Sequence, residues 1–131
     1  MGNQFDGRER RRYKRVLISP DDNILGFISS SRSTADDSIA VKIIDLSAGG
    51  LHFFIHRSSF EEIRTGDHLM LREIKGTKNL DFIFNVELEV KWVADHPALK
   101  NVGLGCEFLN ISEEMRQNIH QFIDTMELLE C

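Results

Sequence analysis

Two short segments of the chain hold the residues best suited to bind a ligand. The first is a basic arm, Arg8 to Arg15, in which six of eight residues are cationic and only Glu9 is anionic, so the arm carries +5 while the whole chain carries -5. It contains an RxxxR pair, Arg11 and Arg15, with Arg10 directly before it. Charge confined to one short arm favours a small anionic ligand or a local contact over a long polyanion such as DNA.

The second segment is Asp45-Leu46-Ser47-Ala48-Gly49-Gly50, which has the pattern DxSxxG. A carboxylate such as Asp45 only accepts hydrogen bonds, whereas the hydroxyl of Ser47 both donates and accepts. Gly50 either supplies a positive φ or leaves room for a ligand against bare backbone, and Gly49 is the better candidate for a pure turn residue. The alternative is an Asx-type turn in which Asp45 and Ser47 satisfy their own backbone.

The remaining reactive residues do not predict catalysis or metal binding. His52 and His56 are four residues apart, which on a strand separates them by about 13 Å, so no shared metal is expected. Cys106 and Cys131 are too far apart in the chain to indicate a disulfide framework; we expect a buried thiol and a loose tail. No nucleophile elbow is present. We therefore expect no enzyme, no cofactor and no metal.

Length and composition favour a single domain. The chain has 131 residues, of which 41% are hydrophobic and 28% charged, enough for one modest core. Residues 1–7 are expected to be a flexible N-terminus and 8–130 one domain. Since no apolar run of about 18 residues exists, no membrane insertion is expected and a cytoplasmic location is predicted.

Alternating apolar residues predict a mainly β domain that ends in a helix. In the clearest strand, 82–92, the alternation predicts one apolar face made by Phe84, Val86, Leu88, Val90 and Trp92. Trp92 is therefore expected in the core. Ser112 is expected to cap a helix over 112–129. One-sided strands followed by a helix predict a small barrel over 16–110 with the helix packed on it. The expected strands are 23–30, 38–46, 51–55, 68–72, 82–92 and 102–109, with a short helical turn at 60–64.

The order of these features resembles the PilZ domain family. RxxxR precedes the first strand, DxSxxG lies between two strands, and a strand ending in Trp92-Val93, a VGLGCEF strand and a closing helix come after them. The resemblance covers Glu9 to about Met126, with a rather long polar loop at 29–38 as the main departure. It implies a six-stranded antiparallel β-barrel with a C-terminal α-helix, and the bacterial second messenger cyclic di-GMP as ligand.

The chemistry of the two segments suits that ligand. Arginine can pair with guanine O6 and N7, stack on a purine or hold a phosphate, and a carboxylate can accept from the N1–H and N2–H groups of guanine. Trp92 or Tyr13 could instead stack on a guanine. The predicted ligand-binding residues are Arg10, Arg11, Arg15, Asp45, Ser47 and Gly50.

These features predict a receptor whose arm, residues 8–15, folds onto the barrel when cyclic di-GMP binds, and which signals to an unknown partner protein. The three arginines of the arm further predict two nucleotides per domain. Three alternatives stay open: a PilZ-like interaction module that does not bind the nucleotide, a small RNA-binding β-barrel, and an unrecognised enzyme.

Overall fold

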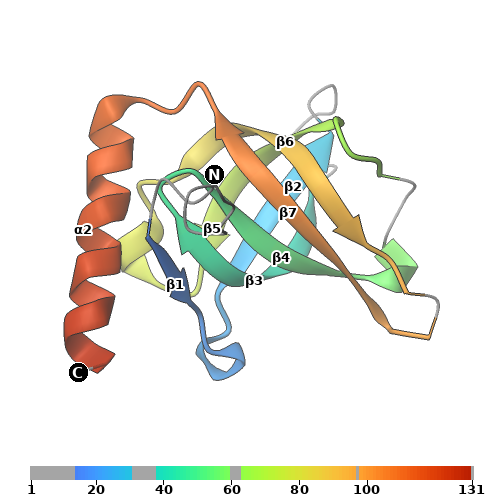
Figure 1. Ribbon diagram of the computed structural model, residues 1–131, viewed down its shortest axis with the longest axis horizontal. Coiled ribbons are helices and arrows are strands. Elements are labelled where there is room, and N and C mark those ends of the chain that lie inside the picture. Colours follow the sequence, from blue (N-terminus) through green and yellow to red (C-terminus); the bar gives the residue numbers. More distant parts are fainter. Residues whose placement is uncertain (1–13, 31–37, 60–62, 97, 131) are drawn as a thin grey trace, which may run out of the picture.

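The computed structural model describes residues 14–30, 38–59, 63–96 and 98–130 (Figure 1). Most of the basic arm, including Arg10 and Arg11, lies outside these ranges, as do Tyr13, Cys131 and much of the predicted turn at 60–64. The described strands are β1 (Arg15–Leu17), β2 (Leu25–Ser30), β3 (Ile39–Ser47), β4 (Gly50–His56), β5 (His68–Lys75), β6 (Phe84–Ala94) and β7 (Asn101–Leu109). The helical segments are η1 (Pro20–Asp22), η3 (Arg57–Ser59), η4 (Lys78–Leu80) and α2 (Glu113–Glu130).

Six of the strands close into an antiparallel barrel, as the resemblance implied. The ring runs β2, β3, β4, β7, β6, β5 and back to β2. A seventh strand, β1, lies outside the ring and pairs with the last residues of β3, so that Arg15 stands opposite Ser47 and Leu17 opposite Asp45. This short strand was not predicted, because its residues straddle the cationic arm and the expected start of the barrel. It holds the end of the basic arm against the DxSxxG segment.

The alternation in β6 is confirmed in the middle of the strand and wrong at both ends. Val86, Leu88 and Val90 are buried in the barrel, whereas Phe84 and Trp92 are exposed on its outside. At Phe84 the alternation is broken by Asn85, whose φ is 52°. At Trp92 it is broken by a β-bulge: Val90 pairs with Cys106 and Trp92 with Gly105, so one extra residue lies between them on β6. Because a bulge inserts one residue, the side chains beyond it point to the opposite face of the sheet.

A second bulge has the same effect in β3. Ile43 pairs with Phe53 and Asp45 with His52, which leaves Ile44 as the extra residue. Ile43 and Leu46 are both buried in the core, and Asp45 between them faces outward. Without the bulge Asp45 would continue the inward series of Ile43. The carboxylate thus reaches the outer surface through a local change of strand register.

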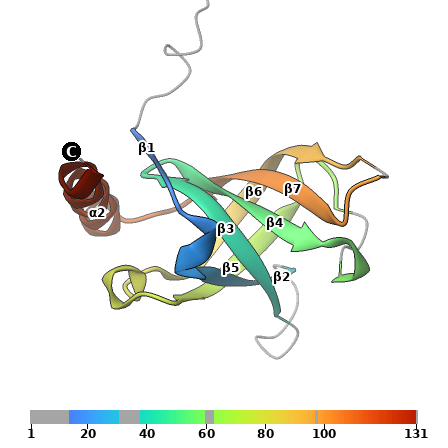
Figure 2. The ribbon, with the colours of Figure 1, turned by 90° about the horizontal axis from the view of Figure 1, so that it is seen from below.

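The C-terminal helix packs beside the barrel near β1 and the end of β3 (Figures 1 and 2). Ser112 caps it as predicted, because its hydroxyl accepts a hydrogen bond from the Met115 amide at 3.1 Å. Ile119, Phe122 and Ile123 are buried in the common core. No described helix is long and apolar enough to span a membrane. The bounds of α2 differ from the prediction by one residue at each end.

Candidate functional site

A row of outward-facing residues crosses the strands next to the end of β1. Asp45 on β3 pairs with His52 on β4, His52 with Gly105 on β7, and Gly105 with Trp92 on β6. We call these four residues the outer row. Their chain neighbours Leu46, Leu51, Phe53, Leu104 and Cys106 are buried in the core. The barrel therefore presents a carboxylate, an imidazole and an indole along one line.

The Asp45 carboxylate joins two cationic or hydrogen-donating side chains. Its Oδ2 lies 2.6 Å from Nδ1 of His52, and its Oδ1 lies 3.9 Å from Nε of Arg15. The exposed fractions of the side chains are 9% for Asp45, 17% for His52 and 32% for Arg15. The Arg15 contact is an ion pair and too long for a hydrogen bond, so Oδ1 keeps the capacity to accept one. Arg15 and Asp45, predicted from separate motifs, are brought together.

Ser47 stabilises the turn that comes after β3. Its Oγ accepts a hydrogen bond from the Gly49 amide at 3.2 Å and lies 3.4 Å from the Gly50 carbonyl oxygen. The alternative of a self-satisfying turn therefore holds for Ser47, which makes this contact with its own backbone. It does not describe Asp45, whose carboxylate is engaged by His52 and Arg15 instead.

Gly50 is required by a close approach of two backbones. A Cβ at this position would overlap the carbonyl oxygen of Cys106 and lie 3.1 Å from Cα of Glu107. Its φ is not positive, since the described glycines with positive φ are Gly66 and Gly76. Of the two roles expected for Gly50, the positive φ is wrong. The space beside the bare backbone of Gly50 is filled by the backbone of β7 of the protein itself. This close approach allows β4 to begin directly after the turn.

Trp92 lies over Gly105, a second glycine that faces the outside of the barrel. Trp92 is 40% exposed as a residue, and a Cβ added at Gly105 would overlap its indole nitrogen and lie 2.8 Å from Cδ2 of His52. The His52 and Trp92 rings are 4.9 Å apart between centroids and tilted by 55°. The expectation that Trp92 belongs to the core is wrong, because the bulge at Lys91 turns it outward. An exposed indole on a rigid strand can stack on a flat base.

The electrostatic surroundings differ on the two sides of the outer row. Towards β1, Arg15 supplies positive charge. On the β6–β7 side, Lys91 lies 3.3 Å from Glu107 and 3.6 Å from Glu89. The hydrogen bond and the charge of Glu107, together with the smaller effect of the Glu89 charge, raise the pKa of Lys91. Anionic groups of a ligand are therefore attracted to the Arg15 side.

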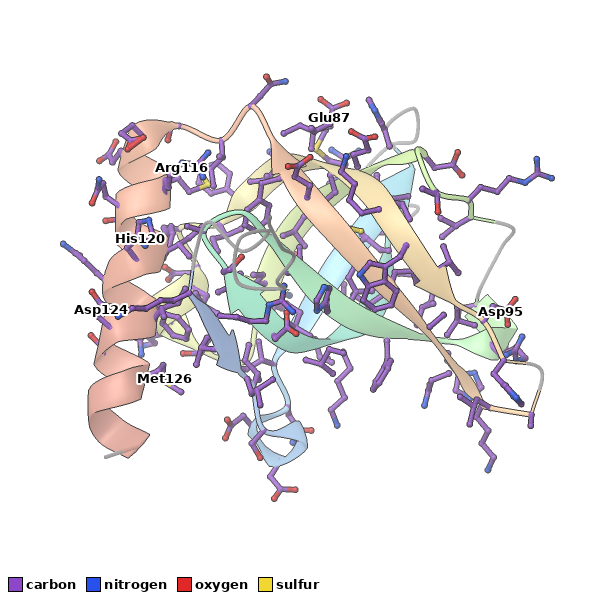
Figure 3. The ribbon with its side chains drawn as sticks, viewed as in Figure 1. Glu87, Asp95, Arg116, His120, Asp124 and Met126 are labelled. Atoms are coloured by element: carbon purple, nitrogen blue, oxygen red, sulfur yellow. The ribbon has the colours of Figure 1, made fainter. Side chains whose placement is uncertain are left out.

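The helix contacts both parts of the site. Nη1 of Arg116 donates a hydrogen bond to the Ala48 carbonyl at 3.0 Å, in the turn after Ser47. Lys14, directly before β1, lies 3.8 Å from Asp124. Figure 3 shows Arg116 extending from α2 towards the barrel. The turn and the end of the arm thus share α2 as a neighbour.

His52 is the site residue that the sequence reasoning missed. As half of a pair with His56 it predicts no metal site, but its alternation with the apolar Leu51 and Phe53 is a signal for an outward side chain. Among the described residues, no group of three or more histidine, cysteine or acidic side chains could hold a metal ion. Arg10 and Arg11, also predicted for the site, lie outside the described residues.

The fold and the site together define a small antiparallel barrel domain with a C-terminal helix and a candidate ligand site on its outer face. The chain belongs to the PilZ domain family, whose model matches residues 9–125. The resemblance inferred from the two motifs is confirmed. No curated relative matched the sequence.

Solved structures share this fold at low sequence identity. The PilZ domain of YcgR from Escherichia coli, solved with c-di-GMP, is 19% identical and has a TM-score of 0.69. The match covers 92% of this chain and 94% of that domain. MotI/DgrA, an inhibitor of motility from Bacillus subtilis, is 18% identical with a TM-score of 0.65; 93% of this chain covers 53% of it. MrkH from K. pneumonia, solved with c-di-GMP, is 17% identical with a TM-score of 0.63; 92% of this chain covers 54% of it. The chain thus spans about half the length of these two larger proteins.

Proposed function

We propose that this chain is a receptor for cyclic di-GMP that binds the nucleotide on the outer face of the barrel, between the basic arm and Trp92, and catalyses no reaction. The main support is the 3.9 Å separation of Arg15 Nε and Asp45 Oδ1. It brings the end of the RxxxR segment to the first residue of the DxSxxG segment. The family and the structures of YcgR and MrkH with c-di-GMP support the choice of ligand.

In the proposed complex each part of the site meets a different part of the nucleotide. Arg11 and Arg15 bind guanine O6 and N7 or a phosphate, since a guanidinium suits both. Asp45 accepts from the N1–H and N2–H groups of guanine through Oδ1. Ser47 completes the contacts at the turn, and the Trp92 indole, exposed on the outer row, stacks on a base. Glu89 and Glu107 keep the phosphates on the Arg15 side.

We further propose that binding orders the part of the arm that precedes β1, residues 8–14, since Arg15 already belongs to β1. The signal then passes to a partner protein in the cytoplasm, where a nucleotide messenger acts. The Arg116–Ala48 hydrogen bond and the Lys14–Asp124 ion pair support this, because they connect the turn and the arm to α2. A conformational change at the site is therefore transmitted to α2 through these two contacts.

Calorimetric titration tests the proposal directly. We expect micromolar or tighter binding of cyclic di-GMP and much weaker binding of GTP and cyclic di-AMP. Absence of binding by the folded protein would favour a PilZ-like interaction module, and preferential binding of single-stranded RNA would favour the RNA-binding barrel. Amide hydrogen exchange of residues 8–14 with and without nucleotide tests the switch; equal protection in both states would refute it.

A further inference from the structure

The His52 imidazole occupies the centre of the outer row and contacts the functional groups on both sides of it. Nδ1 lies 2.6 Å from Oδ2 of Asp45, and the ring centroid lies 4.9 Å from that of Trp92. A carboxylate oxygen only accepts, so the proton between Nδ1 and Oδ2 is donated by the imidazole. His52 therefore bonds to one ligand-binding group and packs against another.

The strand pairing makes this arrangement rigid. Gly105 pairs with both His52 and Trp92, and a Cβ at Gly105 would lie 2.8 Å from Cδ2 of His52 and would overlap the indole nitrogen of Trp92. The two rings thus fill the space above a residue that has no side chain. The His52 side chain is only 17% exposed, which leaves its ring little freedom to rotate.

The hydrogen bond also decides how the carboxylate is presented. Oδ2 is bonded to His52, while Oδ1 faces Arg15 at 3.9 Å. A carboxylate held through one oxygen cannot turn to exchange its two oxygens, so Oδ1 stays directed towards Arg15. Hydrogen bonds to charged groups are among the stronger ones in proteins, and one made before binding reduces the cost of ordering on binding.

We propose that His52 is a positioning residue that fixes Oδ1 of Asp45 and the plane of Trp92 for one guanine, and so sets the preference of the site for guanine. This inference rests on the proposed binding of cyclic di-GMP. A base without the 2-amino group, such as hypoxanthine, offers the carboxylate one donor fewer. The preference for guanine over hypoxanthine should consequently depend on a carboxylate that is held in place.

Two substitutions separate the contacts of His52. His52→Asn keeps an N–H donor near the position of Nδ1 but removes the ring, whereas His52→Phe keeps a ring and removes the donor. His56→Phe is the matched control, because His56 is an exposed histidine of the same strand outside the outer row, with its Nδ1 2.7 Å from Ser58 Oγ. Thermal unfolding of each variant establishes that it is folded before binding is measured.

The affinities of the wild type and the variants for cyclic di-GMP and cyclic di-inosine monophosphate are then compared by calorimetry. We expect His52→Phe to weaken cyclic di-GMP by about tenfold or more, as the loss of a bond to a charged group implies, and to bring the ratio of the two affinities close to one. His52→Asn should keep most of the ratio, and His56→Phe all of it. An equal loss for both ligands in His52→Phe, which leaves their ratio unchanged, or no loss for either ligand, would overturn the positioning role while leaving the receptor function intact. Failure of the folded wild type to bind cyclic di-GMP would overturn both.

Discussion

The indole of Trp92 lies over the backbone of Gly105, which is its cross-strand partner on β7. No side chain larger than hydrogen fits at Gly105 without displacing the ring or the neighbouring His52, whose Cδ2 would lie 2.8 Å from the added Cβ. The exposed indole is thus placed by the absence of a side chain on the adjacent strand.

Gly105→Ala should displace Trp92 and weaken nucleotide binding while leaving the barrel folded, because the added methyl group enters the outer face and not the core. Trp92 is the only tryptophan in the sequence, so its fluorescence reports the displacement. Gly103→Ala is the control: it lies on the same face of β7, and its Cβ would be in ordinary contact with the Phe54 ring at 3.4 Å. Similar spectra and affinities for both variants would contradict the assigned role of Gly105.

Arg15→Ala and Arg11→Ala should each remove about 1–3 kcal/mol of binding free energy, the value of one bidentate guanine contact. Arg15 is partly exposed and lies outside the barrel ring, so the free energy of unfolding should change little. Calorimetry on the folded variants measures the effect, and Lys100→Ala, at an exposed position away from the site, serves as the control. Normal affinity in both arginine variants would exclude these residues from the site.

Asp45→Ala should weaken binding and also lower the melting temperature, because it leaves the partly buried N–H of His52 without its acceptor at a cost of about 1–3 kcal/mol. Asp45→Asn should be milder in both respects, since its amide oxygen can still accept from His52. Binding and thermal unfolding are measured on the same samples. A variant Asp45→Ala that melts earlier but binds normally would restrict Asp45 to a structural role.

The number of nucleotides bound tests the predicted contribution of Arg10. Two cyclic di-GMP molecules on one domain bring four negative phosphodiester charges together, and a third arginine beside Arg11 and Arg15 would relieve that repulsion and offer a further stacking plane. We expect a calorimetric stoichiometry of two, which falls to one in Arg10→Leu. A value of one for the unmodified protein, at verified active concentration, would rule this out.

Cys106 should react with thiol reagents only at high pH. Its burial in the barrel raises the pKa of the thiol to about 12, so at pH 8 the reactive thiolate is scarce. In a Cys131→Ser variant, Ellman's reagent should modify the folded protein very slowly at pH 8 and rapidly after denaturation. Since the pKa is higher in the folded than in the unfolded protein, the stabilisation due to the neutral thiol is complete below about pH 9 and is lost as the pH rises towards 12. Rapid modification of the folded protein at pH 8 would show that Cys106 is accessible.

Local patterns in the sequence predicted the barrel with its C-terminal helix, and they indicated Arg15 and Asp45 as site residues. Alternation in 82–92 located the middle of β6, because inward and outward residues of a strand differ in polarity. The capping serine and the helical spacing of Ile119, Phe122 and Ile123 located α2 within one residue at each end. The two motifs indicated Arg15 and Asp45, since these residue types at this spacing carry the resemblance to the PilZ domain.

Only the tertiary structure decided which side of the barrel Asp45 and Trp92 face, and which residue joins them. The extra residues Ile44 and Lys91 form bulges where the register of one strand shifts against its partner, and this depends on the pairing of distant segments that no local pattern records. A strand of strict alternation would have placed both Asp45 and Trp92 inside. His52 acquires its role for the same reason: its bond to Asp45 and its contact with Trp92 exist because β3, β4, β7 and β6 bring them into one row.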